Sequence, residues 1–135
     1  PSRCALLTGR FGIHVNSQNV VPELTNPNDT IGGYQGIAIN MTGIAENLHD
    51  AGYSTHLVGK WDAGMATEYH SPYKRGFDTW LGYWHHSNDY YTQEIEQCGL
   101  NAPVKDLWRF NVTSGVNGPE TNLANGPTCR YIVGI

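Results

Sequence analysis

Five side chains in this sequence have types and spacings that could act on an anion: Arg3, Lys60, Asp62, His85 and His86. Arg3 lies beside the start of a predicted helix, where free N–H donors and a partial positive charge favour an anion. A guanidinium and an ammonium added to such a helix end would make a site for a tetrahedral oxyanion. This site suits a sulfate or phosphate ester, because the transition state concentrates negative charge on the ester oxygens.

Each of these residues also has a purely structural interpretation. An arginine on a short helix is more often a surface or salt-bridged residue, and a lysine after a glycine is often a solvated loop residue. Asp62 could cap the next turn, and the two histidines could be a solvated pair in the aromatic-rich segment TWLGYWHHSNDYY. The aromatic residues themselves favour packing over a sugar-binding platform. Taken singly, none of these residues decides the function.

The first element that would position them is a short helix over residues 2–7. Pro1 suits its first position, where a missing N–H costs nothing, and Gly9 suits its end. Residues 12–40 are rich in Gly, Asn and Pro, which predicts a long irregular connection.

A second helix is predicted between Thr42 as its N-cap and Gly52 as its C-cap. The apolar residues that share one face of this helix are Ile44, Ala45, Leu48 and Ala51. Residues 53–58 form a β-prone run that predicts a short buried strand. A helix that leads into a buried strand favours an α/β sheet, in which ligands gather beyond the carboxyl ends of the strands. Lys60 and Asp62 lie at such an end.

The composition is that of a globular chain of about one domain. It has 135 residues, of which 39% are hydrophobic and 15% charged, and this argues against disorder or a coiled coil. A net charge of -4 without a basic cluster makes nucleic acid a poor candidate partner, and no apolar run is long enough to predict a membrane span. Residues 114–127 contain almost nothing that packs, so we expect an irregular tail over residues 114–135.

The cysteines and the glycosylation sequons give information about the cellular compartment of the protein. The chain has three cysteines without zinc-like spacing: Cys4, Cys98 and Cys129. Because their number is odd, at least one is free or paired outside the chain. Three Asn-x-Thr sequons predict N-glycosylation at Asn28, Asn40 and Asn111. They favour the secretory route, with a lysosomal or extracellular address.

The order of three sequence blocks resembles that of the type I sulfatases. PSRCALLTGR at residues 1–10 is similar to the later part of the sulfatase signature C-x-P-S-R-x-x-L-x-T-G-R. GYSTHLVGKW at residues 52–61 is similar to the second signature, GYxTxxxGKWHxG. RGFD at residues 75–78, followed by GY and DYY, is similar to sulfatases of the arylsulfatase B type. The resemblance is clear over residues 1–91.

This resemblance implies an alkaline-phosphatase-like fold, a mixed sheet flanked by helices. Residues 1–135 would be an internal piece of the N-terminal catalytic domain of a sulfatase that hydrolyses sulfate esters, with a sulfated sugar or glycan as substrate. In the family, a cysteine two places before the Pro1 position is oxidised to formylglycine by the formylglycine-generating enzyme and supplies the nucleophile. That residue would precede this chain, so the chain alone would be inactive. Cys4 lies on the wrong side of Pro-Ser-Arg and is expected to be a small apolar group of the helix.

The family roles transfer to only a few positions. Arg3 matches the arginine that fixes the formylglycine hydrate, and Lys60 matches the lysine that contacts both sulfate and hydrate. Asp62 stands where the signature has histidine; it could pair with Lys60 and act as a base, or His85 or His86 could supply the missing imidazole. The family's calcium ligands are not among these residues, so calcium would be held outside this chain. Two alternatives remain open: a phosphate or phosphonate ester hydrolase of the same superfamily, and a non-catalytic, anion-binding pseudosulfatase.

Overall fold

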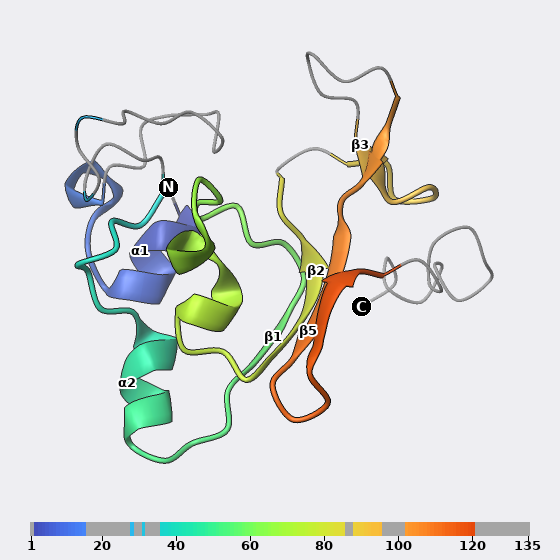
Figure 1. Ribbon diagram of the computed structural model, residues 1–135. Coiled ribbons are helices and arrows are strands. Elements are labelled where there is room, and N and C mark those ends of the chain that lie inside the picture. The colour runs from blue at the N-terminus through green and yellow to red at the C-terminus, as the bar shows by residue number, and fades with distance from the viewer. Residues whose placement is uncertain are drawn as a thin grey trace.

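The computed structural model describes residues 2–15, 28, 31, 36–85, 88–95 and 102–120 of the chain. The helical elements are α1 (Ser2–Thr8), η1 (Gly12–His14), α2 (Ile44–Asp50), η2 (Glu68–His70) and η3 (Pro72–Lys74). The strands are β1 (His56–Val58), β2 (Thr79–Tyr83), β3 (Glu94–Ile95), β4 (Val104–Lys105), β5 (Leu107–Asn111) and β6 (Val116–Pro119). Figure 1 shows α1 and α2 together on one side of the β1, β2 and β5 strands.

The strands form a four-stranded mixed sheet in the order β1-β2-β5-β6 and a separate two-stranded pair, β3 with β4. β1 runs parallel to β2, whereas β5 is antiparallel to both β2 and β6. The predicted α/β class is therefore confirmed, with a mixed sheet and helices packed beside it.

The predicted first helix is confirmed, because α1 spans Ser2–Thr8 and Gly9 follows in a left-handed conformation (φ 68°). The predicted cap of the second helix is wrong. Gly43, not Thr42, is its N-cap, and the Gly43 N–H donates to the Glu46 carboxylate. The Glu46 side chain thus caps the Gly43 N–H, and there is no capping hydroxyl at the helix start. The predicted C-cap is also one residue away: Ala51 is the C-cap, and Gly52 follows it at φ 88° and ends the helix.

The predicted apolar face of α2 and the predicted buried strand need correction. Of the four apolar residues on that face, Ala45 alone is buried, whereas Ile44 and Leu48 are 51% and 39% exposed. β1 is three residues long and lies at an edge of the sheet, and its last residue, Val58, is 71% exposed. The apolar pattern correctly indicated a helix and a strand here, but it could not show which of their faces would be buried by other residues.

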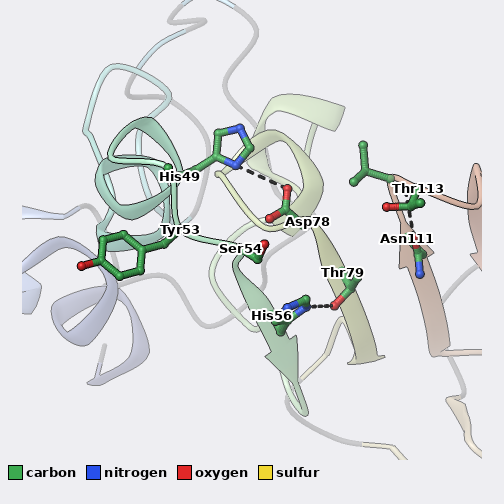
Figure 2. Close-up of a pocket in the computed structure, with 10 residues that line it drawn as sticks. His49, Tyr53, Ser54, His56, Asp78, Thr79, Asn111 and Thr113 are labelled. Atoms are coloured by element: carbon green, nitrogen blue, oxygen red, sulfur yellow. Dashed lines mark hydrogen bonds and ion pairs between the residues drawn. The ribbon is translucent and has the colours of Figure 1, made fainter.

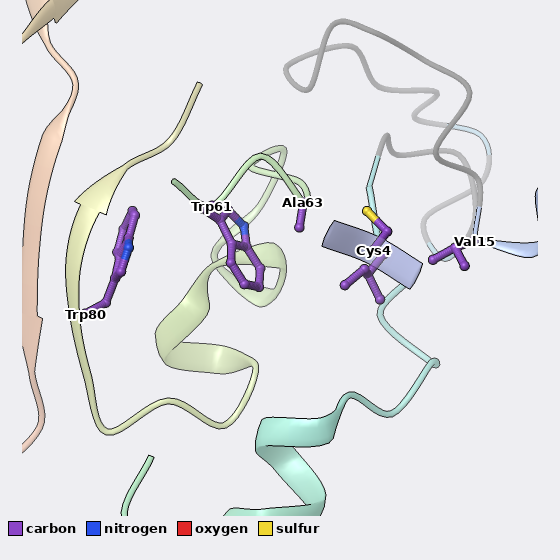
Figure 3. Close-up of a cluster of buried hydrophobic side chains, with 6 residues drawn as sticks. Cys4, Val15, Trp61, Ala63 and Trp80 are labelled. Carbon is purple, nitrogen blue, oxygen red and sulfur yellow. The ribbon is translucent and has the colours of Figure 1, made fainter. Parts of the chain in front are cut away.

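The core lies between the sheet and α1. Its buried side chains are Cys4, Val15, Ile37, Trp61, Ala63 and Trp80. Figure 3 shows Trp80 on β2, then Trp61 and Ala63, then Cys4 on α1. Cys4 is 2% exposed and burial raises the pKa of its thiol, which confirms its prediction as a small apolar group of the helix. Cys98 and Cys129 lie outside the described residues.

The predicted irregular tail over residues 114–135 is wrong for residues 116–119. Val116–Pro119 forms β6, which pairs with β5 through a turn that contains Gly115 at φ 71°. The strand is held by backbone bonds and by edge contacts such as the Arg109–Glu120 ion pair at 3.1 Å. Because most β6 side chains are exposed, their composition carried no strand signal. Residues 121–135 lie outside the described residues.

Candidate functional site

The segment after β1 continues alongside the end of β2. The Trp61 N–H donates to the Tyr83 carbonyl at 2.8 Å, and the Asp62 N–H donates to the Trp84 carbonyl at 3.0 Å. Trp61 is buried in the core. Because side chains alternate along an extended chain, Lys60 lies on the opposite face from Trp61. The carboxyl end of β1 thus presents Lys60 away from the core, as the α/β interpretation predicted.

Three of the predicted site residues meet at this point. The Arg3 Nε donates to the Lys60 carbonyl at 3.2 Å, although the two residues are 57 positions apart. The Lys60 Nζ and the Asp62 Oδ2 form an ion pair at 3.1 Å, with side chains 19% and 27% exposed. The Arg3 guanidinium is therefore bonded to the backbone of the residue whose ammonium pairs with the Asp62 carboxylate. This is the Lys60–Asp62 pair that the sequence analysis offered as one explanation for the missing histidine.

Asp62 is held in the left-handed region, at φ 46°. Few side chains other than Gly adopt this region without strain, and Asn, Asp and His are the residues most enriched there. The turn therefore accepts either the aspartate of this chain or a histidine. It also aims the carboxylate back at Lys60, two residues earlier in the sequence.

The structure places His85 beside a residue that the sequence did not single out. The Asp106 carboxylate accepts the backbone N–H groups of Trp84 and His85 at 3.2 and 3.1 Å. The His85 Nδ1 lies 2.9 Å from the same carboxylate, and the two side chains are 12% and 2% exposed. This burial favours a positioning role over the direct substrate contact predicted for His85. His86 lies outside the described residues.

Tyr83, the last residue of β2, is a further group at this end of the sheet. Its ring packs on that of Tyr90 with centroids 6.0 Å apart, and burial and a hydrogen bond to the Tyr90 phenol raise the pKa of Tyr83 to about 12. The Arg3 guanidinium acts on the same phenol in the opposite direction. The aromatic run had been interpreted as packing, and only the fold brings Tyr83 within electrostatic reach of Arg3.

Other residues of the matching sequence blocks hold the backbone in place. A Cβ on Gly82 would lie 1.8 Å from the Gly59 carbonyl oxygen, so only glycine permits this approach. The Asp78 carboxylate accepts the Thr55 N–H at 2.8 Å and ties the starts of β1 and β2 together. Arg75 is 4% exposed, and its guanidinium contacts the Glu46 carboxylate at 3.3 Å.

A second concave region lies at the opposite ends of the same strands. It has a volume of about 630 Å³ and is lined by residues that include His49, His56, Asp78, Thr79 and Asn111 (Figure 2). Its polar groups bond to one another: His49 to Asp78 at 3.3 Å and His56 to Thr79 at 2.7 Å. None of the predicted catalytic residues lines it, so the cluster around Lys60 remains the better candidate for anion chemistry.

The three predicted glycosylation residues are among the described residues. Asn28 and Asn40 are exposed, and Asn111 ends β5 half-buried. The Asn111 Oδ1 accepts the N–H groups of Thr113 and Ser114 at 2.9 and 3.1 Å. The sequon at Asn111 thus forms a tight turn at the surface of the sheet.

Within the described ranges, no group of three or more His, Cys, Asp or Glu side chains is arranged to hold a metal ion. In the same part of the chain, no helix has both the length and the apolar character needed to cross a bilayer.

Comparison with known proteins gives a family match over most of the chain. The family described as Sulfatase matches residues 1–115. Arylsulfatase J of Mus musculus is 38% identical over 120 residues, which cover 86% of this chain and 19% of that protein. Human N-acetylgalactosamine-6-sulfatase is 39% identical over 113 residues, which cover 82% of this chain and 20% of that protein. The chain thus spans about a fifth of the length of these relatives.

Solved structures give a consistent result. The crystal structure of Ps i-CgsB matches 69% of this chain and 19% of its own, with a TM-score of 0.56 and 32% sequence identity. The same protein in complex with k-i-k-neocarrahexaose matches with a TM-score of 0.55 and 33% identity, over the same shares of the two chains. The fold of the described residues is that of a part of these larger chains.

Proposed function

The chain belongs to the sulfatase family, and from that premise we propose that the complete protein containing these residues hydrolyses sulfate esters. The observation that carries this proposal is the cluster of Arg3, Lys60 and Asp62 at the carboxyl end of β1. Arg3 is bonded to the Lys60 backbone and Lys60 is paired with Asp62, so this segment carries two cationic side chains that suit the charge of a sulfate group.

In this proposal Arg3 and Lys60 bind the sulfate. The Lys60 ammonium is a compact charge that can follow the oxygen on which negative charge develops, whereas the Arg3 guanidinium is a planar donor that fixes orientation. Both would stabilise the transition state more than the ground state, because charge on the sulfate oxygens and the leaving oxygen increases as the S–O bond breaks.

Asp62 is proposed to orient Lys60 and to accept a proton from the nucleophile. Its 3.1 Å contact with the ammonium fixes the lysine, and a carboxylate can act as a base. A carboxylate cannot donate to the sulfate, as a histidine at this position could. Replacement of Asp62 by His with unchanged activity and pH profile would contradict a catalytic role for Asp62.

The family's formylglycine and calcium would be supplied by residues outside this chain. Formylglycine, when present, supplies the oxygen nucleophile, and calcium supplies positive charge. The described residues include no group arranged for a metal, and Cys4 is buried in the core. None of these residues is therefore proposed as the formylglycine precursor or as a calcium ligand. A formylglycine-generating enzyme is proposed as a partner of the complete protein. We propose residues 1–135 as a partial N-terminal catalytic domain, inactive alone.

A sulfated sugar is the proposed substrate class. Support comes from a relative named N-acetylgalactosamine-6-sulfatase and from the Ps i-CgsB complex with k-i-k-neocarrahexaose. The proposed address is the secretory route, lysosomal or extracellular, with N-glycans at Asn28, Asn40 and Asn111. Peptide mass spectrometry of the protein secreted by a eukaryotic host, before and after glycan removal, tests each of the three asparagines.

The catalytic proposal is tested by hydrolysis of 4-nitrophenyl sulfate and 4-nitrophenyl phosphate by the complete protein. We expect preference for the sulfate ester, and a loss of at least a hundredfold in kcat/KM on Lys60→Met. Lys74→Met is the matched control, since Lys74 is exposed and contacts the Tyr69 ring at 5.9 Å. Preference for the phosphate ester would identify the related phosphohydrolase. Sulfate binding without turnover would identify a pseudosulfatase. The presence of Asp62 in place of histidine supports that alternative.

A further inference from the structure

The backbone register places the Tyr83 side chain next to that of Lys60. β1 pairs with β2 so that Val58 lies opposite Leu81. Beyond Val58 the chain turns at Gly59, which has φ 104°, but the hydrogen bonds keep the register. The Gly59 N–H donates to the Leu81 carbonyl at 2.8 Å and the Trp61 N–H, two residues later, donates to the Tyr83 carbonyl at 2.8 Å, which puts Lys60 opposite Tyr83. Opposed residues in a sheet project from the same face, so both side chains lie on the face opposite that of Trp61 and Trp80.

The burial pattern supports this placement. Along β2, Trp80 and Gly82 are buried and the residues between and after them are half-buried, as strict alternation requires. Trp84, two residues beyond Gly82, packs edge-on against Trp80 at 4.7 Å. Tyr83 therefore belongs to the face of Lys60, not to the tryptophan face.

A second aromatic residue holds the Tyr83 phenol. Tyr90 approaches it with ring centroids 6.0 Å apart and an interplanar angle of 63°. Tyr90 is itself carried by a turn in which the Asp89 carboxylate accepts two backbone N–H groups, those of Tyr91 and Thr92, at 2.7 and 2.9 Å. Burial and the Tyr90 bond raise the pKa of Tyr83 to about 12, so its hydroxyl keeps its proton throughout the physiological range.

We propose that the Tyr83 hydroxyl is a further substrate-contacting group, which donates a hydrogen bond to a non-bridging oxygen of the sulfate held by Arg3 and Lys60. This inference rests on the proposed function of the same site. A hydrogen bond that raises the pKa of Tyr83 is one in which Tyr83 is the donor. When the anion binds, the Tyr83 hydrogen therefore rotates about its C–O bond from Tyr90 to the sulfate oxygen, and the Tyr90 hydroxyl then donates to the Tyr83 oxygen. Tyr83 then supplies an uncharged hydrogen-bond donor to the sulfate, which the Asp62 carboxylate cannot do.

The test compares Tyr83→Phe with Tyr91→Phe in the complete protein. Tyr91 is on the neighbouring turn and 80% exposed, so it controls for loss of one phenol hydroxyl nearby. Two quantities are measured: kcat/KM for 4-nitrophenyl sulfate, and the Kd of inorganic sulfate by calorimetry. Tyr83→Phe should lower kcat/KM by about 10- to 100-fold and weaken sulfate binding by about 10-fold, the range for a hydrogen bond to a charged group. Tyr91→Phe should change neither by more than about twofold.

A third variant and the binding measurement separate the possible failures. Tyr90→Phe should cost less than Tyr83→Phe, about two- to fivefold in kcat/KM, because it removes only the support of the donor. Wild-type levels of both quantities in a folded Tyr83→Phe protein would overturn the inference while leaving the sulfatase proposal intact. If the wild-type protein binds sulfate but does not hydrolyse the ester, and Tyr83→Phe weakens binding, the proposed function fails and the Tyr83 contact stands. A wild-type protein that binds no sulfate would overturn both.

Discussion

Asp62→Asn is expected to strengthen the binding of inorganic sulfate to the complete protein while it slows turnover. The substitution keeps the shape of the side chain and its tolerance for the left-handed conformation at φ 46°, so the turn should persist. What changes is the charge 3.1 Å from the Lys60 ammonium. In the wild type this carboxylate repels an anion that approaches the same ammonium.

The size of the effect follows from the geometry. A sulfate oxygen in contact with the Lys60 Nζ would lie about 6 Å from the Asp62 carboxylate, the sum of two contacts of about 3 Å. Two like unit charges at that distance repel by about 3 kcal/mol at an effective dielectric constant of about 20 and by about 0.7 kcal/mol at about 80. Because the side chains are 19% and 27% exposed, an intermediate value of about 1.4 kcal/mol is expected, or about tenfold in Kd.

Isothermal titration calorimetry with sodium sulfate measures this change directly, and steady-state hydrolysis of 4-nitrophenyl sulfate measures the loss in kcat. Added salt should reduce the gain in affinity, because part of the repulsion is screened by solvent. Asp50→Asn, at the exposed end of α2, controls for loss of one negative charge elsewhere. Sulfate affinity that is unchanged or weaker in Asp62→Asn would refute the placement of the anion on Lys60. Unchanged kcat would refute Asp62 as a base.

Three further predictions concern the stability of the fold. Gly82→Ala should unfold the protein or lower its unfolding free energy by at least about 3 kcal/mol. The control is Gly118→Ala, which has open space at its Cβ and should lower the unfolding free energy by less than about 1 kcal/mol. Urea denaturation measures both values. Arg75→Met should reduce stability by about 3 kcal/mol in the same assay, because it leaves the Glu46 carboxylate without its 3.3 Å partner. The hydrogen bond from the Thr55 N–H, and to a lesser extent the charge of His49, lower the pKa of Asp78. The ionised Asp78 therefore stabilises the folded protein above about pH 4, and this stabilisation is lost as the pH falls through the lowered pKa. Asp78→Asn should therefore flatten the acid limb of a plot of melting temperature against pH.

The elements with local sequence signals could be predicted from the sequence, and those held by distant contacts could not. Gly9 and Gly52 mark helix ends because each must adopt a positive φ, and each helix ends just before its predicted glycine. β6 escaped prediction because it is stabilised by pairing with β5, and its own side chains are mostly exposed. Which faces of α2 and β1 would be covered depends on packing partners and not on their own periodicity.

The same distinction applies to the site. Arg3, Lys60 and Asp62 were found from residue type and from the order of the sequence blocks, and the structure brings the three together. Asp106 is 21 residues from His85 in the sequence, and no local pattern linked this carboxylate to the imidazole. Tyr83 looked like one member of an aromatic run, and only the register with β1 separates it from the tryptophans of the core.

The exchange of histidine for aspartate in the second signature is best understood as an electrostatic change within an unaltered backbone. The left-handed turn at residue 62 accepts both residue types, and the Asp62 N–H is bonded to the Trp84 carbonyl whichever side chain is present. The exchange therefore need not move Lys60 or Arg3. It removes a donor and adds a negative charge beside a sulfate site, so a working enzyme needs another donor on the same face. Among the described residues, the Tyr83 phenol meets that requirement by register, by its support from Tyr90 and by its retained proton.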